Sequence, residues 1–273
     1  MSICARLYHN TPKPFSAQSP LLSLMILSAF GDVHWKDGIG RLRDARNKFG
    51  RCDLALLAGD ITDSNNLDGY GEVIGAIKEM SDADIIAVFG NEEYDASHID
   101  YRGRFRITFL EDEVKDITVE GVKLRIVGST GSLDRPTWWQ RNNVPDIWRR
   151  YNERVNKVGG LLERGDADVL ILLTHYATTY ATLEGEKGHA FAEMGSNLFE
   201  QIVLEKHPDL VIHAHAHNGK RHAILTKKQR SFENFKSADA EFPVYNVSIP
   251  ANQGPTFFEI EGGNDGVRIR YMQ

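Results

Sequence analysis

Short apolar runs that end in polar loops recur along the chain, and they constrain the fold more than any other feature. The runs are LMILSAF (24–30), DLALLAG (53–59), DIIAVFG (84–90), VKLRIVGS (122–129), DVLILLTH (168–175) and DLVIHAH (209–215). Between several of them, apolar residues recur with helical spacing, over residues 38–49, 68–80, 147–164 and 196–206. Strands that alternate with helices predict an α/β fold, in which ligands collect at the carboxyl ends of the strands.

The last third of the chain changes character. The segments RHAILTK, FPVYNVSI, TFFEIEG and GVRIRYM follow one another as strands without intervening helices, and we expect a second sheet that completes the same domain. No repeat or low-complexity linker divides the sequence, so we predict one domain over residues 24–273 after a weakly ordered extension over residues 1–23. An insertion at about residues 129–150 holds three of the four tryptophans.

The composition is that of an ordinary globular protein, with 41% apolar and 26% charged residues among 273. A formal charge of −6 argues against stable binding to nucleic acid, which needs a dense field of Lys and Arg. The two cysteines, Cys4 and Cys52, lie outside any CxxC spacing, so neither a disulfide framework nor a thiolate metal site is indicated. We therefore expect a cytoplasmic protein.

One apolar segment, Leu21 to Phe30, could be mistaken for a targeting signal. It is too short to span a membrane, and it runs directly into the GDVH motif that follows the first predicted strand. We interpret it as a core strand and expect no membrane association.

Residues that can bind metal ions follow five of the predicted strands. They are Asp32 and His34 in FGDVH, Asp60 in AGD, Asn91 in FGN, His175 in LLTH, and His215 and His217 in HAHAH. Any one of them alone is more often a turn former, a helix cap or a hydrogen-bonded structural residue. Together they supply the carboxylate, imidazole and amide ligands that a two-metal hydrolytic site requires, with Asp60 as the natural bridge.

With these motifs in this order, the sequence resembles the calcineurin-like metallophosphoesterases. The family signature is Asp-x-His, Gly-Asp, Gly-Asn-His-(Asp/Glu), a His after a strand, and Gly-His-x-His. The corresponding segments are GDVH (31–34), GD (59–60), GNEE (90–93), TH (174–175) and AHAH (214–217). The resemblance covers residues 25–217 and implies a four-layer αββα sandwich, in which two mixed sheets are flanked by helices.

The resemblance also implies a dinuclear centre and a reaction. One metal ion would be held by Asp32, His34 and His217. The other would be held by Asn91, His175 and His215, with Asp60 bridging the two. Manganese is the expected ion, and Fe, Zn, Ni or Co fit the same ligands. A metal-bound hydroxide would attack the phosphorus of a phosphoester substrate, such as a nucleotide, at a site whose catalytic residues are Asp60, Asn91, Glu92 and His175.

Glu92 departs from the family pattern, which usually has a histidine near the leaving-group oxygen. Two nearby dications favour the ionised carboxylate, which has no proton to donate and repels a phosphomonoester dianion more than a diester monoanion. We therefore expect phosphodiesters, cyclic nucleotides or activated aryl esters to be preferred. His98 or His189 could replace the missing acid, and the alternative for both is a solvated loop histidine.

Three further residues of the motifs need an interpretation. Glu93 matches the usual acidic position of the family, behind the metal ligands. Ala214 replaces a glycine and adds only a methyl group, so we expect little effect. His213 sits one strand period before His215 and is interpreted as a core residue or a neighbour of the ligands.

The insertion has two interpretations. Trp138 and Trp139 could stack on a base while nearby arginines (Arg135, Arg141, Arg149 and Arg150) meet phosphates. Alternatively, a helix packs its aromatic residues on the sheet or on a partner subunit, which suits Trp148 better. Two other functions also remain open: a catalytically weak metal-binding scaffold, and a DNA-processing nuclease. The sequence leaves the physiological substrate and the oligomeric state open, and a homo-oligomer is compatible with it.

Overall fold

The structure, a computed structural model, describes residues 23–227, 240–263 and 266–272. Its strands form two six-stranded sheets. The first sheet contains β1 (Ser23–Phe30), β2 (Leu54–Ala58), β3 (Asp84–Val88), β4 (Thr108–Leu110), β11 (Thr256–Gly263) and β12 (Gly266–Met272). The second contains β5 (Glu113–Val119), β6 (Val122–Ser129), β7 (Val169–Thr174), β8 (Leu210–His213), β9 (His222–Lys227) and β10 (Ala240–Asn246). Both sheets mix parallel and antiparallel pairs.

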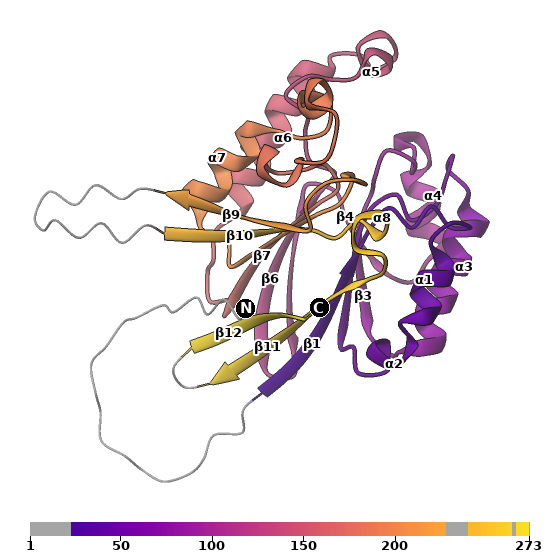
Figure 1. Cartoon of the computed structure of the whole chain (residues 1–273), viewed down its shortest axis with the longest axis vertical. Coiled ribbons are helices and arrows are strands. Elements are labelled where there is room, and N and C mark those ends of the chain that lie inside the picture. Colours follow the sequence, from indigo (N-terminus) through magenta and orange to yellow (C-terminus); the bar gives the residue numbers. More distant parts are fainter. Residues whose placement is uncertain (1–22, 228–239, 264–265, 273) are drawn as a thin grey trace, which may run out of the picture.

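Helices cover the outer side of each sheet. The α-helices of the described residues are α1 (Ile39–Asp44), α2 (Arg46–Phe49), α3 (Leu67–Met80), α4 (His98–Arg104), α5 (Trp138–Asn143), α6 (Ile147–Leu161), α7 (Asn197–Lys206) and α8 (Ile249–Asn252). Short 3-10 helices are η1 (Asp95–Ser97), η2 (Tyr180–Thr182) and η3 (Gly188–Glu193). Figure 1 shows α1 to α4 beside the first sheet and α6 and α7 beside the second.

Alternation of buried side chains along the strands produces the layers. In β2, Leu54 and Leu56 pack between the two sheets, whereas Ala55 and Leu57 pack against the outer helices. In β7, Ile171 faces the space between the sheets in the same way. Strands covered on both faces read as continuous apolar runs, as parallel strands of α/β proteins do. The predicted αββα sandwich of two mixed sheets is confirmed.

The carboxyl ends of the central strands meet at one end of the molecule. β1, β2, β3 and β4 are mutually parallel in the first sheet, and β6, β7, β8 and β10 are mutually parallel in the second. The two sheets are joined there, because Gly31 forms a bridge with Ser248, its N–H donates to Val247 O and its carbonyl accepts from Ile249 N. Loops from both sheets therefore converge on one region.

The predicted helices are present with small differences at their ends. α3, α6 and α7 occupy the predicted segments, and Ser196 caps α7 by accepting a hydrogen bond from Leu198 N. The helix expected over residues 38–49 forms as two short helices, α1 and α2, because the backbone leaves the helical conformation at Ala45.

The prediction for the last third of the chain is only half right. β9 and β10 complete the second sheet, but β11 and β12 return to the first sheet, where β11 pairs antiparallel with β1. This pairing buries Phe258 and Ile260 against β1, on the face between the sheets. A strand pattern read from sequence predicts which residues form a strand but not its neighbour, and here the open edge of β1 was the alternative partner.

The segment from Leu21 to Phe30 contributes β1 from Ser23 onward, which fits its interpretation as a core strand. The predicted extension over residues 1–23 lies outside the described residues except for Ser23. The insertion at about residues 129–150 contains α5 and the first turn of α6. Of the helices in the described part of the chain, none is long and apolar enough to cross a membrane.

Candidate metal centre

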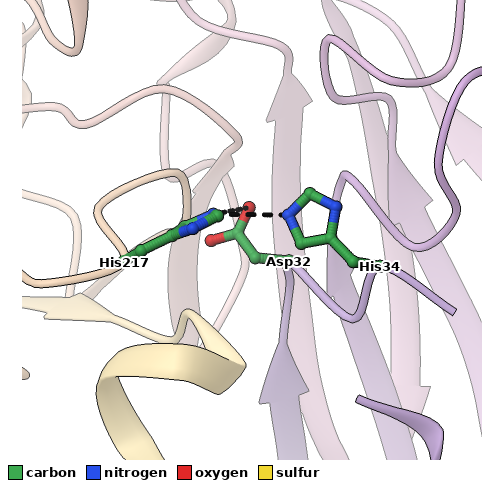
Figure 2. A group of neighbouring side chains, drawn as sticks. All are labelled: Asp32, His34 and His217. Atoms are coloured by element: carbon green, nitrogen blue, oxygen red, sulfur yellow. Dashed lines mark hydrogen bonds and ion pairs between the residues drawn. The ribbon is translucent and has the colours of Figure 1, made fainter. Parts of the chain in front are cut away.

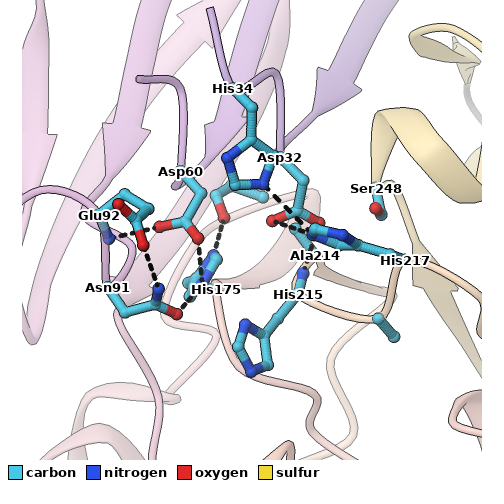
Figure 3. Close-up of polar contacts among 12 residues, drawn as sticks. Asp32, His34, Asp60, Asn91, Glu92, His175, Ala214, His215, His217 and Ser248 are labelled. Carbon is cyan, nitrogen blue, oxygen red and sulfur yellow. Dashed lines mark hydrogen bonds and ion pairs between the residues drawn. The ribbon is translucent and has the colours of Figure 1, made fainter. Parts of the chain in front are cut away.

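The strand-end loops bring six of the predicted ligands into two groups. Asp32, His34 and His217 form the first group, and Asp60, His175 and His215 form the second. Within each group, one ligand atom from each side chain lies within 4.8 Å of the others. Figures 2 and 3 show these side chains converging from separate loops. The division is the one expected from the family resemblance, with Asn91 to be added to the second group.

The first group is built on a turn with unusual backbone geometry. Nε2 of His34 lies 3.3 Å from Nε2 of His217, which lies 3.6 Å from Oδ1 of Asp32. Asp32 and His34 have φ angles of 51° and 46°, in the left-handed region that non-glycine residues seldom adopt. Hydrogen bonds from their N–H groups to the carbonyls of Gly59 and Asp60 hold the turn in place. Such strain is typical of functional sites.

The second group includes the predicted amide ligand. Nε2 of His175 lies 3.5 Å from Oδ2 of Asp60 and 3.1 Å from Oδ1 of Asn91. The rings of His175 and His215 lie 4.9 Å apart at an angle of 64°. The N–H of His215 also donates to Oδ2 of Asp32 at 2.8 Å. The two groups are therefore parts of one site.

Hydrogen bonds fix which ring nitrogen of two histidines faces the site. Nδ1 of His175 donates to the carbonyl of Ala58 at 2.9 Å, and Nδ1 of His34 lies 2.7 Å from Oδ1 of Asp63. In both rings Nε2 is left to face the other candidate ligands, the arrangement found around metal-bound histidines. Asp63 was not identified from the sequence. Its one signal was its place three residues after Asp60, in the segment GDITD.

Two glycines allow the loops to approach one another. A Cβ atom on Gly90 would lie 2.1 Å from Oδ1 of Asp60. Gly59 has a φ of 81°, and a Cβ there would lie 2.6 Å from Gly90 N and 2.9 Å from Nδ1 of His175. The glycines of the GD and GN motifs are thus required by close packing around the ligands.

Glu93 joins the loops after β2 and β3 from behind the site. Its buried carboxylate accepts hydrogen bonds from the N–H groups of Asp60 and Gly90 at 2.9 and 2.8 Å. It also accepts from Ile61 and Thr62 at 2.8 and 3.2 Å. This is the place that the family pattern implied for the acidic residue.

The electrostatics of the site suit divalent cations. Burial, followed by the charges of Glu93 and Asp32, raises the pKa of Asp60 well above its usual range. Burial also raises the pKa of Asp32, but the neighbouring histidines, His217 first, lower it more, so that its net pKa is below the usual range. Burial lowers the pKa of His215 to about 3, which leaves a neutral imidazole with a free lone pair.

An unsatisfied oxygen gives the same indication. Oδ1 of Asp32 is buried, and no described residue donates a hydrogen bond to it, since Nε2 of His217 is 3.6 Å away. A buried carboxylate oxygen without a partner is costly, and so are carboxylates that crowd together, as those of Asp32, Asp60 and Glu93 do. Cations between the two groups would remove both penalties, so the side chains present fit a dinuclear metal centre.

Glu92 is bound to the surrounding loops. Its N–H donates to Oδ1 of Asp60 at 2.8 Å, and its carboxylate accepts from the N–H of Ser64 at 2.7 Å. Figure 3 shows the side chain next to that of Asn91, at the edge of the second group.

The three other histidines discussed above have separate surroundings. His98 is 7% exposed, stacks on Phe89 and lies 3.1 Å from both Glu93 O and Glu111 Oε1, so the solvated-loop interpretation is wrong for it. Its ring supports the Glu93 loop from behind. His189 is exposed in η3, as that interpretation expected. His213 is fully buried with Nε2 2.8 Å from Thr182 Oγ1, which agrees with its interpretation as a core residue.

The methyl group of Ala214 packs against Gly31, which directly follows β1. A Cβ on Gly31 would lie 2.5 Å from Cβ of Ala214, so the methyl group fills the space that Gly31 leaves free. The expectation that the change from glycine has little effect stays a prediction.

Besides Asp63, two residues near the candidate ligands were missed in the sequence. The ring of Tyr176 lies 5.3 Å from that of His175 and 5.0 Å from that of His215, and it is buried. Its only sequence signal is that it directly follows His175. Ser248 is fully buried beside the site in Figure 3, and among the described residues its Oγ has no hydrogen-bond partner. It is the N-cap residue of α8 and lies two residues after β10, a strand whose sequence carries no candidate metal ligand.

The insertion carries its tryptophans at the surface. Trp138, Trp139 and Trp148 are 70%, 61% and 52% exposed, so packing of Trp148 on the sheet is wrong. The nearby arginines form ion pairs: Arg135 and Arg141 with Glu193, Arg149 with Asp146 and Glu153, and Arg150 with Asp95. Gln140 of α5 donates a hydrogen bond to Tyr176 OH at 3.2 Å. The insertion is therefore attached, through Tyr176, beside the second group.

Comparisons with known proteins concern the fold and the family. Similar solved structures include a protein assigned as a 5′-nucleotidase from Staphylococcus aureus (14% identity, TM-score 0.53, covering 92% of this chain and 53% of that one). A second is a protein from Thermus thermophilus (12% identity, TM-score 0.53, covering 90% of this chain and 98% of that one). A third is a purple acid phosphatase from yellow lupin seeds (12% identity, TM-score 0.53, covering 95% of this chain and 52% of that one). At these identities the likeness concerns the fold.

The chain spans about half the length of the nucleotidase and of the purple acid phosphatase. No curated protein matches its sequence. The family model for the calcineurin-like phosphoesterases matches residues 27–219, a span that includes every candidate ligand. The chain therefore belongs to the calcineurin-like phosphoesterase family, whose characteristic reaction is metal-dependent hydrolysis of phosphoesters.

Proposed function

We propose that this protein is a phosphoester hydrolase that prefers diesters, cyclic nucleotides or activated aryl esters to alkyl monoesters. The observation that carries the proposal is the environment of Glu92. Both oxygens of its carboxylate accept hydrogen bonds, from Ser64 N at 2.7 Å and from Asn91 Nδ2 at 3.4 Å. An ionised carboxylate held in this way has no proton for a departing alkoxide.

The ligand assignment is part of the proposal. Asp32, His34 and His217 would hold one cation, and Asn91, His175 and His215 the other, with Asp60 between them. When bound, two such cations supply an activated water molecule and neutralise charge on the transferring phosphoryl group. The protein's own contribution is to orient these ligands: Asp63 and Ala58 fix two imidazoles, and Glu93 holds the Asp60 loop. Manganese is the proposed ion, with Fe, Zn, Ni or Co as substitutes.

Substrate preference follows from the missing acid and from charge. Without a proton donor at position 92, an alkoxide of high pKa leaves slowly, whereas an activated aryl oxide needs no such help. The Glu92 carboxylate beside Asn91 adds negative charge that disfavours a monoester dianion more than a diester monoanion. The missing acid favours activated aryl esters over alkyl esters, and the charge of Glu92 favours diesters over monoesters.

The insertion supports a nucleotide or aryl group on the substrate. Gln140 links α5 to Tyr176, whose ring packs on His175 and His215, so α5 is attached beside the second group. Trp138 and Trp139 directly precede Gln140 and are exposed, which leaves their rings available for stacking. Replacing both with Ala should lower turnover of nucleotide esters more than that of small aryl esters. Equal effects on both substrates would remove the stacking role.

The main experiment compares a bis-aryl phosphodiester with the matching aryl monoester on Mn²⁺-loaded protein. We expect the higher kcat/KM for the diester, and we expect Glu92→His, assayed at saturating Mn²⁺, to shift the ratio of the two kcat/KM values toward the monoester. A strong monoester preference in the wild-type protein would overturn the proposal. Metal binding without turnover of any phosphoester would instead indicate a scaffold, and salt-dependent DNA binding with cleavage would indicate a nuclease.

A cytoplasmic location is also part of the proposal. Cys52 is buried with a free thiol, which is compatible with the reducing cytoplasm. Size-exclusion chromatography with light scattering would establish whether the protein is a homo-oligomer.

A further inference from the structure

We propose that Glu92 is a positioning residue that connects the two halves of the metal centre and orients Asn91. This inference rests on the proposed metal centre. Glu92 stands where the family usually has a histidine, and an imidazole at that position could not make the same contacts.

Four hydrogen bonds tie Glu92 to its surroundings. Its N–H donates to Oδ1 of Asp60 at 2.8 Å, and its carbonyl accepts from Asn65 N at 2.8 Å. One carboxylate oxygen accepts from Ser64 N at 2.7 Å, and the other accepts from Nδ2 of Asn91 at 3.4 Å. The side chain thus contacts the loop after β2 and a candidate ligand of the second group at once.

The loop that Glu92 holds is strained. Ser64 and Asn65 have φ angles of 47° and 60°, in the left-handed region. Such a conformation persists only where surrounding contacts enforce it. Glu92 satisfies the N–H groups of both residues, one through its carboxylate and one through its carbonyl. We infer that these bonds hold the loop in its observed form.

This loop also carries the residue that orients a ligand of the first group. Asp63 directly precedes Ser64, and its Oδ1 lies 2.7 Å from Nδ1 of His34. A chain of contacts therefore runs from Glu92 through Ser64 and Asp63 to His34. Glu92 also touches Asp60 and Asn91 directly, so a single residue supports ligands in both groups.

The contact with Asn91 decides which end of its amide faces the metal site. Only the oxygen of an amide can bind a cation, and the NH₂ group cannot. Because Nδ2 donates to the Glu92 carboxylate, Oδ1 is directed to within 3.1 Å of Nε2 of His175. A neutral imidazole has only one acceptor nitrogen, so it could not accept from both Ser64 and Asn91.

Metal affinity of purified full-length protein tests the inference, measured by titration calorimetry with Mn²⁺ and without any substrate. Glu92→Ala should weaken binding by about 10- to 100-fold, as loss of residues that orient metal ligands commonly does. Glu92→Gln keeps an oxygen for Ser64 N and should weaken it by about fivefold or less. Asp95→Ala is the matched control, because it removes the same charge from the same loop while its own bond is to Arg150.

Hydrogen exchange at the Ser64 amide provides a second readout, in the metal-free protein. Exchange should be faster in Glu92→Ala than in the wild type and unchanged in Asp95→Ala. Wild-type affinity and wild-type Ser64 exchange in Glu92→Ala would overturn the inference, and so would equal weakening by Asp95→Ala, which would indicate a simple charge effect. Failure of the wild-type protein to bind two Mn²⁺ would instead refute the proposed metal centre itself.

Discussion

Adding one methyl group at Gly90 is predicted to disable the site. The new Cβ would lie 2.1 Å from Oδ1 and 2.4 Å from N of Asp60. Non-bonded atoms at those positions need on the order of 1 Å more room, so Asp60 or the Gly90 loop must move by that amount. The N–H of Glu92, which donates to the same oxygen at 2.8 Å, must then move as well.

The size of the effect follows from this displacement. Overpacking of this kind costs about 1–3 kcal/mol of unfolding free energy. A shift of about 1 Å in a catalytic group lowers turnover by about 100-fold. Gly90→Ala should therefore remain folded at 25 °C, with weaker Mn²⁺ binding and about 1% of the wild-type kcat/KM on an aryl diester. Urea unfolding, titration calorimetry and a diester assay measure the three quantities.

Gly75→Ala is the matched control, because it makes the same substitution where nothing lies within 4 Å of the new Cβ. Gly75 is in the middle of α3, where alanine is favoured over glycine by about 0.5–1 kcal/mol. This variant should be more stable than the wild type and equal to it in metal binding and turnover. Wild-type Mn²⁺ affinity in Gly90→Ala would refute the packing argument.

Three further results are expected. Asp63→Ala should weaken Mn²⁺ binding by about 10- to 100-fold in calorimetry, because the His34 ring loses the partner that orients it. Burial lowers the pKa of His98, but the Glu111 carboxylate raises it more, so the net pKa lies above 6.5. The stabilisation from the His98–Glu111 pair is therefore present below about pH 6.5 and is lost as the pH rises through the raised pKa of His98. Glu111→Gln should accordingly cost more unfolding free energy at pH 6 than at pH 8.5. Removal of metal with a chelator should lower the Tm, since the buried carboxylates of the site then repel one another without compensation, and readdition of Mn²⁺ should restore it.

The candidate ligands could be found in the sequence because each lies at the end of an apolar run or within a few residues after it. In a parallel sheet, that local signal is enough to bring residues far apart in sequence to one edge. Asp32 and His175 are separated by most of the chain, yet both sit where their strands end. The family pattern then supplied the division into two groups, which the geometry reproduces.

Other parts of the site depend on contacts that leave no local pattern. Asp63 orients His34 only because two loops from neighbouring strands pack together, and a lone acidic residue in a loop is usually solvated. For His98 the sequence offered a replacement acid or a solvated loop histidine, but stacking on Phe89 and the contact with Glu93 O bury it behind the site. The return of β11 to the first sheet was also hidden, since alternation along a strand does not identify its neighbour.

The pairing of β11 with β1 also affects how a newly made chain can fold. All candidate ligands lie between residues 32 and 217, so a nascent chain exposes the complete set before β10 and β11 have been synthesised. At that stage β1 has β2 on one side and, on the other, an open edge of unpaired backbone N–H and C=O groups. Unpaired edges of this kind invite aggregation. A chaperone that shields β1 until β11 has been synthesised would protect the chain during this interval. Early binding of metal ions, which would hold the two groups of candidate ligands together, would have the same effect.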